Sequence, residues 1–206
     1  SLSSSNHPFG PQSAELLQNT RELDASLLTE SQTLRQSLSL VEQIFSQDLA
    51  RSIMLSYTGV RALGWDTHAG NHMQHWHIEE LFTELRSFLT ALKNRSALSG
   101  RTLIKEVTVV VMSEMGRFPR FNFRDGRDHW TFTSAWLMGA GVKGGQTIGG
   151  WDPYCLGRPI NLESGIQQDS GTLLTPKHFG ATLLQLADID PLSMLSTPPV
   201  LSALSD

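Results

Sequence analysis

The run Val107–Met112 most constrains how this chain can fold. It places six apolar or β-branched residues in succession, VTVVVM, with no polar face. Such a run is typical of a strand that is buried on both sides in a parallel sheet. Ser113 and Glu114 end it. A carboxylate directly after a central strand lies at the edge where open α/β sheets bind ligands, so we expect Glu114 at a ligand-binding edge.

The loop after this strand is dense in polar and ionisable side chains. Its members are Asn122, Arg124, Asp125, Arg127, Asp128 and His129. A solvated surface loop is the plain alternative to a functional one, because loops are usually polar. Composition alone leaves both interpretations open.

A long amphipathic helix is predicted over residues 71–98. Its apolar stripe comprises Met73, Trp76, Leu81, Leu85, Phe88 and Leu92. Residues 53–57 alternate in polarity and predict a short strand before it. A strand–helix–strand unit favours a right-handed crossover in a parallel sheet, whose loops open on one edge. We therefore expect Asp66 and His68, after the first strand, to approach Glu114 and His129, after the second.

These four side chains suit a divalent metal ion such as zinc, manganese, calcium or magnesium. Asp66 and His68 are two residues apart in a loop, a spacing that can chelate one ion. The alternatives are a turn or helix-capping carboxylate for Asp66 and a structural hydrogen bond for His129. We expect His72, His75 and His77 to lie on the surface of a helix. We expect His178, near a helix N-terminus, to have a structural role.

Composition excludes several other classes. The chain has 206 residues, 39% of them hydrophobic and 17% charged, which is typical of a globular protein. Its net charge is -4 with no basic run, so we expect no nucleic-acid partner. No stretch reaches the roughly 20 apolar residues that span a bilayer. The single Cys155 excludes an intramolecular disulfide and a cysteine-based zinc site. The glycines of residues 139–150 match no phosphate-binding motif, and no GxSxG is present.

The expected organisation is one α/β domain over residues 13–195. A flexible leader over residues 1–12 precedes it, and a mobile tail over residues 196–206 follows it; both are rich in small polar residues and proline. The leader has neither a basic segment nor an apolar core, so it is no signal peptide. Further helices are predicted over residues 13–28 and 34–49, and from Thr175-Pro176 to the stop at Asp190-Pro191.

Several blocks of this sequence, in order, resemble one bacterial family. They are Gly64–His68 (GWDTH), Ser113–Pro119 (SEMGRFP), Gly126–Trp130 (GRDHW) with Asn122 before it, Gly139–Gly149, Ala181–Leu184 and Ile189–Pro191. They are similar to the signature blocks of the family catalogued as domain of unknown function 1501, and the resemblance covers roughly residues 40–195. The family resembles sulfatases and alkaline phosphatases.

This resemblance implies an alkaline-phosphatase-like, or sulfatase-like, three-layer α/β sandwich with a mostly parallel central sheet. It also implies an exported, periplasmic location. The implied metal ligands are Asp66, His68, Glu114 and His129. The implied substrate-binding residues are Arg117, Asn122 and Asp128, with Trp65 and Trp130 as walls of the site.

The chain also departs from the family pattern. Phe118 stands where the family usually has threonine, and Glu114-Met115 stands where the superfamily often has Asp-His. His178 replaces an acid. The early strand with its aspartate and nucleophile is not among these 206 residues, which correspond to the C-terminal half.

Three functions follow as hypotheses. The first is a metal-dependent hydrolase of phosphate or sulfate esters, inactive as this chain alone, that takes a small anionic ester. The second is a noncatalytic binding or envelope-associated module with the same fold. The third is a structural fragment whose sheet a partner chain or a missing N-terminal half completes.

Overall fold

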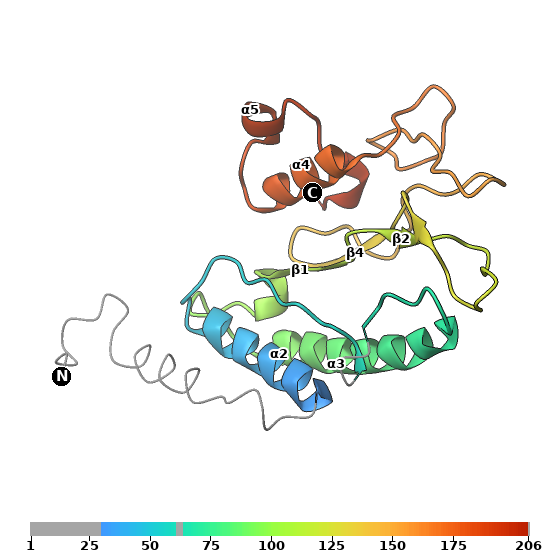
Figure 1. Cartoon of the computed structure of the whole chain (residues 1–206). Helices are drawn as coiled ribbons and strands as arrows, with labels where there is room; N and C mark the ends of the chain where they lie inside the picture. The colour runs from blue at the N-terminus through green and yellow to red at the C-terminus, as the bar shows by residue number, and fades with distance from the viewer. Residues whose placement is uncertain (1–29, 61–63, 206) are drawn as a thin grey trace. The chain divides into compact units, whose positions relative to one another are not determined.

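A computed structural model describes residues 30–60 and 64–205 of the chain. They belong to two compact units, residues 1–103 and residues 104–206, which are described separately below. The boundary falls inside the single domain expected over residues 13–195. The expected leader and the helix expected over residues 13–28 lie outside the described residues. Figure 1 shows the elements of both units.

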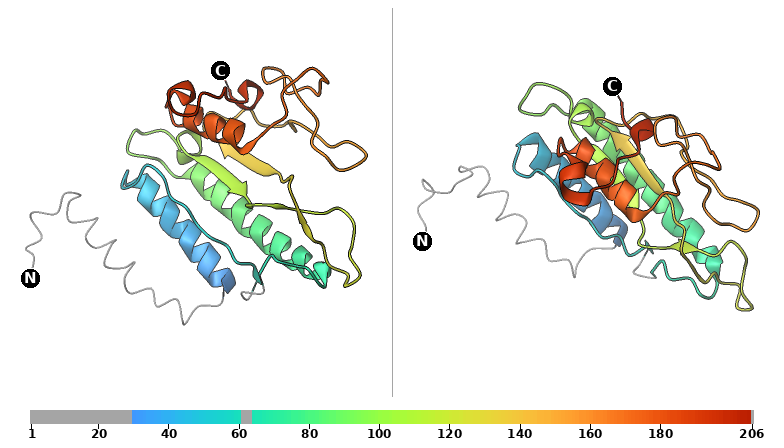
Figure 2. Two further views of the ribbon diagram at one scale, coloured as in Figure 1. Left: turned by 45° about the horizontal axis from the view of Figure 1, so that its top comes forward. Right: turned by 90° about the horizontal axis from the view of Figure 1, so that it is seen from above.

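The first unit is built on two helices that lie side by side, α2 (Glu30–Ser46) and α3 (Gln74–Asn94) (Figure 2). A 3-10 turn, η3 (Asn71–Met73), leads into α3. The helical predictions are confirmed, although α3 ends at Asn94 because Arg95 is extended. The buried apolar side chains of the two helices are Leu34, Val41, Leu85, Phe88 and Leu92. Each such burial stabilises the fold by about 1.5–3 kcal/mol.

A buried carboxylate also joins the two helices. Glu84 of α3 is 4% exposed and accepts hydrogen bonds from Arg35 of α2, with Nη2–Oε1 at 2.6 Å and Nε–Oε2 at 3.0 Å. The hydrogen bond with Glu84, and then its charge, raise the pKa of the Arg35 guanidinium. A buried charge needs such a partner. The pair therefore fixes how α2 is aligned along α3.

The strand predicted over residues 53–57 is wrong. These residues form no regular element. Ile53 and Tyr57 are half-buried and Met54 is 96% exposed, as the alternation implies, but Leu55 is 43% exposed and none of the described strands pairs with the segment. Tyr57 instead donates its hydroxyl to Glu80 Oε2 at 2.5 Å, which ties the segment to α3. The predicted strand–helix–strand unit is therefore absent from the described part of the chain.

The second unit begins with two strand pairs. β1 (Thr108–Met112) pairs with β4 (Ala135–Gly139), and β2 (Gly116–Arg117) pairs with β3 (His129–Trp130). A strand is confirmed within residues 107–112, but its predicted burial on both faces is wrong, since β1 is half-buried with Met112 56% exposed, and every pair among the described strands is antiparallel. The chain returns from β1 to β4 through the β2–β3 hairpin, and a parallel pair would need a crossover. The alkaline-phosphatase-like sandwich stays a prediction.

Gly139 ends β4 in a position that only glycine fits. Its φ is +95°, and a Cβ atom there would lie 2.2 Å from the carbonyl oxygen of Val107. The absence of a side chain therefore lets the ends of β1 and β4 approach closely.

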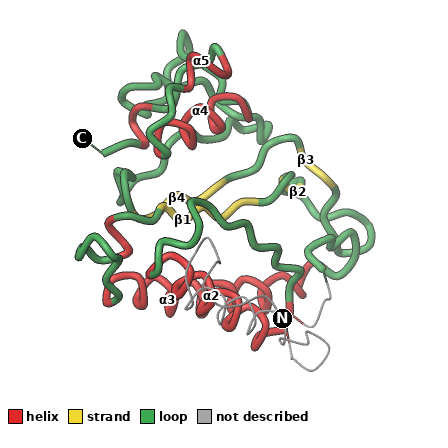
Figure 3. The backbone as a smooth tube through the Cα atoms, turned by 90° about the vertical axis from the view of Figure 1, so that its left-hand side faces the viewer, coloured by secondary structure: helices red, strands yellow, loops and turns green. Residues whose placement is uncertain are grey.

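The rest of the second unit is mostly loop with short helices (Figure 3). The helices are α4 (Pro176–Leu186), α5 (Pro191–Leu195) and the 3-10 turn η5 (Leu201–Ala203). His178 has the predicted structural role, because its Nδ1 accepts the Thr175 backbone N–H at 3.2 Å in a capping box. Asp190 and Pro191 begin α5 instead of ending α4.

The mobile tail predicted over residues 196–206 is wrong for its described part. Val200 and Ala203 are buried in one cluster with Ile160. The Val200 backbone N–H also donates to Thr182 Oγ1 at 2.9 Å. Serine and proline dominate the composition of this segment, and they obscured the two apolar residues that anchor it.

Among the residues that the structure describes, no helix is both long and apolar enough to cross a membrane.

Candidate functional site

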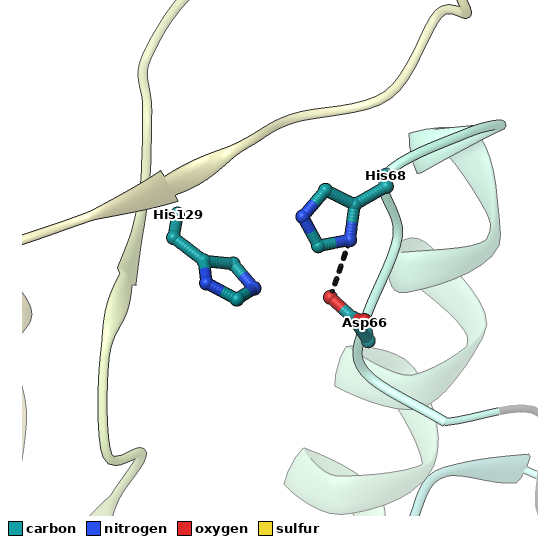
Figure 4. A group of neighbouring side chains, drawn as sticks. All are labelled: Asp66, His68 and His129. Carbon is teal, nitrogen blue, oxygen red and sulfur yellow. Dashed lines mark ion pairs between the residues drawn. The ribbon is translucent and has the colours of Figure 1, made fainter.

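Asp66 and His68 form an ion pair in the loop that precedes α3. His68 Nδ1 lies 2.7 Å from Asp66 Oδ1, and the side chains are 41% and 67% exposed, respectively. Figure 4 shows the pair as a dashed line. The structure thus places the two predicted ligands in contact with each other, and it leaves both accessible to solvent.

The start of α3 holds this loop in place. Thr67, which is buried, donates its hydroxyl to Asn71 Oδ1 at 3.0 Å. Gln74 Nε2 donates to Thr67 Oγ1 at 2.8 Å and to the Trp65 carbonyl at 3.3 Å. The residues on either side of Asp66 are therefore fixed by side chains of the first helical turns.

A buried histidine of α3 packs against this loop and forms hydrogen bonds with its backbone. His77 is 0% exposed, so its predicted place on the helix surface is wrong. The Val60 backbone N–H donates to its Nδ1 at 2.9 Å, and its Nε2 lies 3.0 Å from the Gly64 carbonyl. Because Nδ1 accepts, the proton is on Nε2 and the ring is neutral. Gly59 packs so closely that a Cβ atom there would lie 2.9 Å from the ring.

Trp65 belongs to the same packed group. Its ring centroid lies 5.0 Å from that of His77 and 5.8 Å from that of Tyr57. Its indole N–H donates to the Tyr57 carbonyl at 3.1 Å. Trp65, predicted as a wall of the site, is thus held rigidly beside Asp66.

The Asp66–His68 distance indicates which atoms are available to a metal. Two ligand atoms on one tetrahedral zinc, with bonds of about 2.0–2.1 Å, are about 3.4 Å apart. The observed 2.7 Å is a hydrogen-bond distance. With the Nδ1–H held by Asp66, His68 presents Nε2, which is the arrangement of a carboxylate–histidine–metal triad. The donor set therefore fits a divalent ion.

Glu114 and His129, the other two predicted ligands, belong to the second unit. Glu114 is exposed two residues after β1. His129 is exposed and lies on β3 (Figure 4). Its Cα atom is paired with that of Arg117. Their participation in a site with Asp66 and His68 stays a prediction.

Asn122 and Asp128, two predicted substrate-binding residues, lie together in the loop between β2 and β3. Asn122 Nδ2 donates to Asp128 Oδ1 at 2.9 Å. Asn122 Oδ1 accepts the backbone N–H groups of Arg124 at 2.9 Å and Gly126 at 3.0 Å. These contacts give the Asn122 amide a structural role in closing the loop.

Arg117 and Trp130 line a cavity of about 460 Å³ in the second unit. The other lining residues are Pro119, Phe132, Thr133, Ser134, Trp151 and Cys155. Arg117 Nη1 donates to the Arg127 carbonyl at 3.1 Å, and Trp130 Nε1 donates to the Cys155 carbonyl at 2.8 Å. A guanidinium beside aromatic rings can hold an anionic group on an apolar scaffold. Sequence reasoning missed Phe132, Trp151 and Cys155, which lie in segments without periodicity.

The fold and this geometry define an α/β protein with a candidate divalent-metal site. A family model described as "Protein of unknown function (DUF1501)" matches residues 11–198. The chain belongs to this family, so the resemblance seen in the signature blocks is confirmed at that level. The link to sulfatases and alkaline phosphatases stays a prediction. No curated protein and no solved structure matches the chain.

Proposed function

We propose that this chain supplies metal ligands and an anion-binding arginine to a metal-dependent hydrolase of phosphate or sulfate esters. The observation that carries the proposal is the Asp66–His68 pair, 2.7 Å apart, accessible and anchored to α3. An aspartate–histidine pair on a surface loop is solvated whether or not hydrogen bonds from a helix hold that loop in place. Hydrogen bonds that hold such a loop are typical of sites whose ligands must keep a fixed orientation.

The proposed roles follow from the chemistry of each side chain. His68 binds the metal through Nε2, while Asp66 orients the ring and increases its basicity. Glu114 and His129 are the remaining ligands in this proposal. Arg117 faces the anionic ester with its planar guanidinium. A bound divalent ion would polarise the ester oxygen and activate water.

The second candidate is a noncatalytic binding module, and one observation favours it. Hydrolysis by a covalent route needs a nucleophile held near the metal. Ser113, which precedes Glu114, donates its hydroxyl to the Met115 carbonyl at 2.7 Å, and Thr67, between Asp66 and His68, donates its hydroxyl to Asn71 Oδ1 at 3.0 Å. The first of these contacts makes Ser113 part of a turn. Binding of metal and anion without turnover would be the whole function in this case.

Calorimetric titration of the purified chain with zinc, manganese, magnesium and calcium tests the proposal. We expect His68→Ala to abolish binding of the preferred ion, and Asp66→Asn to weaken it about 10–100-fold. His72→Ala is the matched control, because His72 is an exposed histidine in the same region. Equal affinity of wild type and His68→Ala would refute the site.

His129→Ala and Glu114→Gln test the contribution of the second unit in the same titration. Loss of affinity in either variant supports the ligand role proposed for that residue. Unchanged affinity in both variants, with loss in His68→Ala, would contradict the ligand roles proposed for Glu114 and His129.

A further inference from the structure

The loop between β2 and β3, residues 118–128, combines arginine side chains with exposed aromatic rings. We call it the basic loop. It carries Arg120, Arg124 and Arg127 against Asp125 and Asp128, although the whole chain has a net charge of -4. Two of its three rings, Phe121 and Phe123, are 60% and 96% exposed, whereas Phe118 packs against Trp130. Exposed phenylalanines beside arginines are unusual on a surface that only contacts water.

Internal hydrogen bonds hold the tip of the basic loop. The backbone N–H of Asn122 donates to the Gly126 carbonyl at 2.9 Å, and the Asn122 side chain accepts the N–H groups of Arg124 and Gly126. Asp125 adopts φ +54° within this turn. Phe123 lies between these fixed points, so it is displayed outward by a closed turn.

Arg127 is engaged within the loop, whereas Arg120 and Arg124 are exposed. Arg127 Nη1 donates to the Pro119 carbonyl at 2.5 Å, and its guanidinium carbon lies 4.5 Å from the centre of the Phe121 ring. Arg120 and Arg124 are both exposed on the surface of the loop. The basic loop thus presents two rings and two cations from one short segment.

We propose that the basic loop docks on the surface of an anionic lipid bilayer. Phe121 and Phe123 enter the interfacial region, and Arg120 and Arg124 contact the anionic headgroups. Aromatic insertion and attraction of basic residues to acidic lipids are the two terms that bind peripheral proteins to membranes. This inference is independent of the metal site.

Charge and ring geometry favour lipid over a nucleic-acid strand. The basic loop carries three arginines against two aspartates in a chain that is negative overall, so a long polyanion would meet repulsion beyond the loop. Arg127 also covers one face of Phe121, which reduces its value as a stacking platform for bases. Binding to a bilayer, by contrast, requires contact with the tip of the loop alone.

Flotation of the full chain with vesicles tests the proposal. The vesicles are phosphatidylcholine with or without phosphatidylglycerol. We expect binding only to the anionic vesicles, decreasing with added salt. Arg120→Gln with Arg124→Gln should weaken binding roughly 30-fold. Phe121→Ser with Phe123→Ser should weaken it at least about tenfold.

Two control variants remove the same chemistry elsewhere. Tyr154→Ser deletes an aromatic ring that is 79% exposed, and Arg86→Gln deletes an exposed arginine of α3. Neither should change vesicle binding. Equal binding to both vesicle types, equal losses in the controls, or binding of single-stranded RNA without vesicle binding would each overturn the proposal.

Discussion

His77→Ala should destabilise the first unit strongly, because this ring joins α3 to the loop that precedes it. The substitution removes the hydrogen bonds to the Val60 N–H and the Gly64 carbonyl, each worth about 1 kcal/mol net. It also leaves a cavity beside Trp65, where the ring is 0% exposed, which we expect to cost about 2 kcal/mol more. The expected loss is about 4 kcal/mol of unfolding free energy.

Urea unfolding followed by circular dichroism and tryptophan fluorescence measures this loss. His75→Ala is the matched control, since His75 is an exposed histidine on the same helix and should shift stability by no more than about 0.5 kcal/mol. His77→Gln should recover about 1 kcal/mol relative to alanine, because its amide can still donate toward Gly64. A loss below about 1 kcal/mol for His77→Ala would refute the supporting role of this ring.

Three further predictions concern the core, one glycine and catalysis. Leu92→Ala, at a fully buried position, should lower stability by about 2–5 kcal/mol in urea unfolding, whereas Leu98→Ala, 70% exposed, should leave it within about 0.5 kcal/mol. Gly139→Ala should cost more than Gly100→Ala, because both have positive φ but only Gly139 faces a backbone oxygen; equal thermal midpoints would contradict this. With aryl phosphates and sulfates and added zinc, manganese or calcium, the chain should show no turnover above a His129→Ala control. Metal-dependent turnover that His129→Ala abolishes would mean that a nucleophile has been overlooked.

The sequence was most informative where periodicity and burial agree. The apolar spacing predicted α2 and α3, because burial of an apolar face determines these helices, and the β-branched run predicted β1 but not that it is only half-buried. The two-residue spacing of Asp66 and His68 predicted two ligands of one ion, whereas the structure shows the two side chains in contact with each other at 2.7 Å. Alternation at residues 53–57 failed, because one hydrogen bond from Tyr57 fixes that segment without a neighbouring strand.

The burial of His77 could have been predicted from the apolar pattern of α3, although we expected this residue on the surface. It lies four residues after Met73 and four before Leu81, and therefore on the apolar stripe itself. A polar residue on such a stripe is buried if partners are available, and here the partners are backbone groups of a distant loop. Contacts of this kind depend on tertiary structure, so the stripe could indicate burial but not the partners.

Cys155 offers direct experimental access to the cavity beside Trp130. It is the only cysteine of the chain, is partly exposed and lines the same hollow as Trp151. A thiol-reactive dye would therefore attach at one known position, close to indoles that quench many fluorophores. Occupancy of the cavity could then be followed as a change in emission from the natural sequence, with no engineered label site.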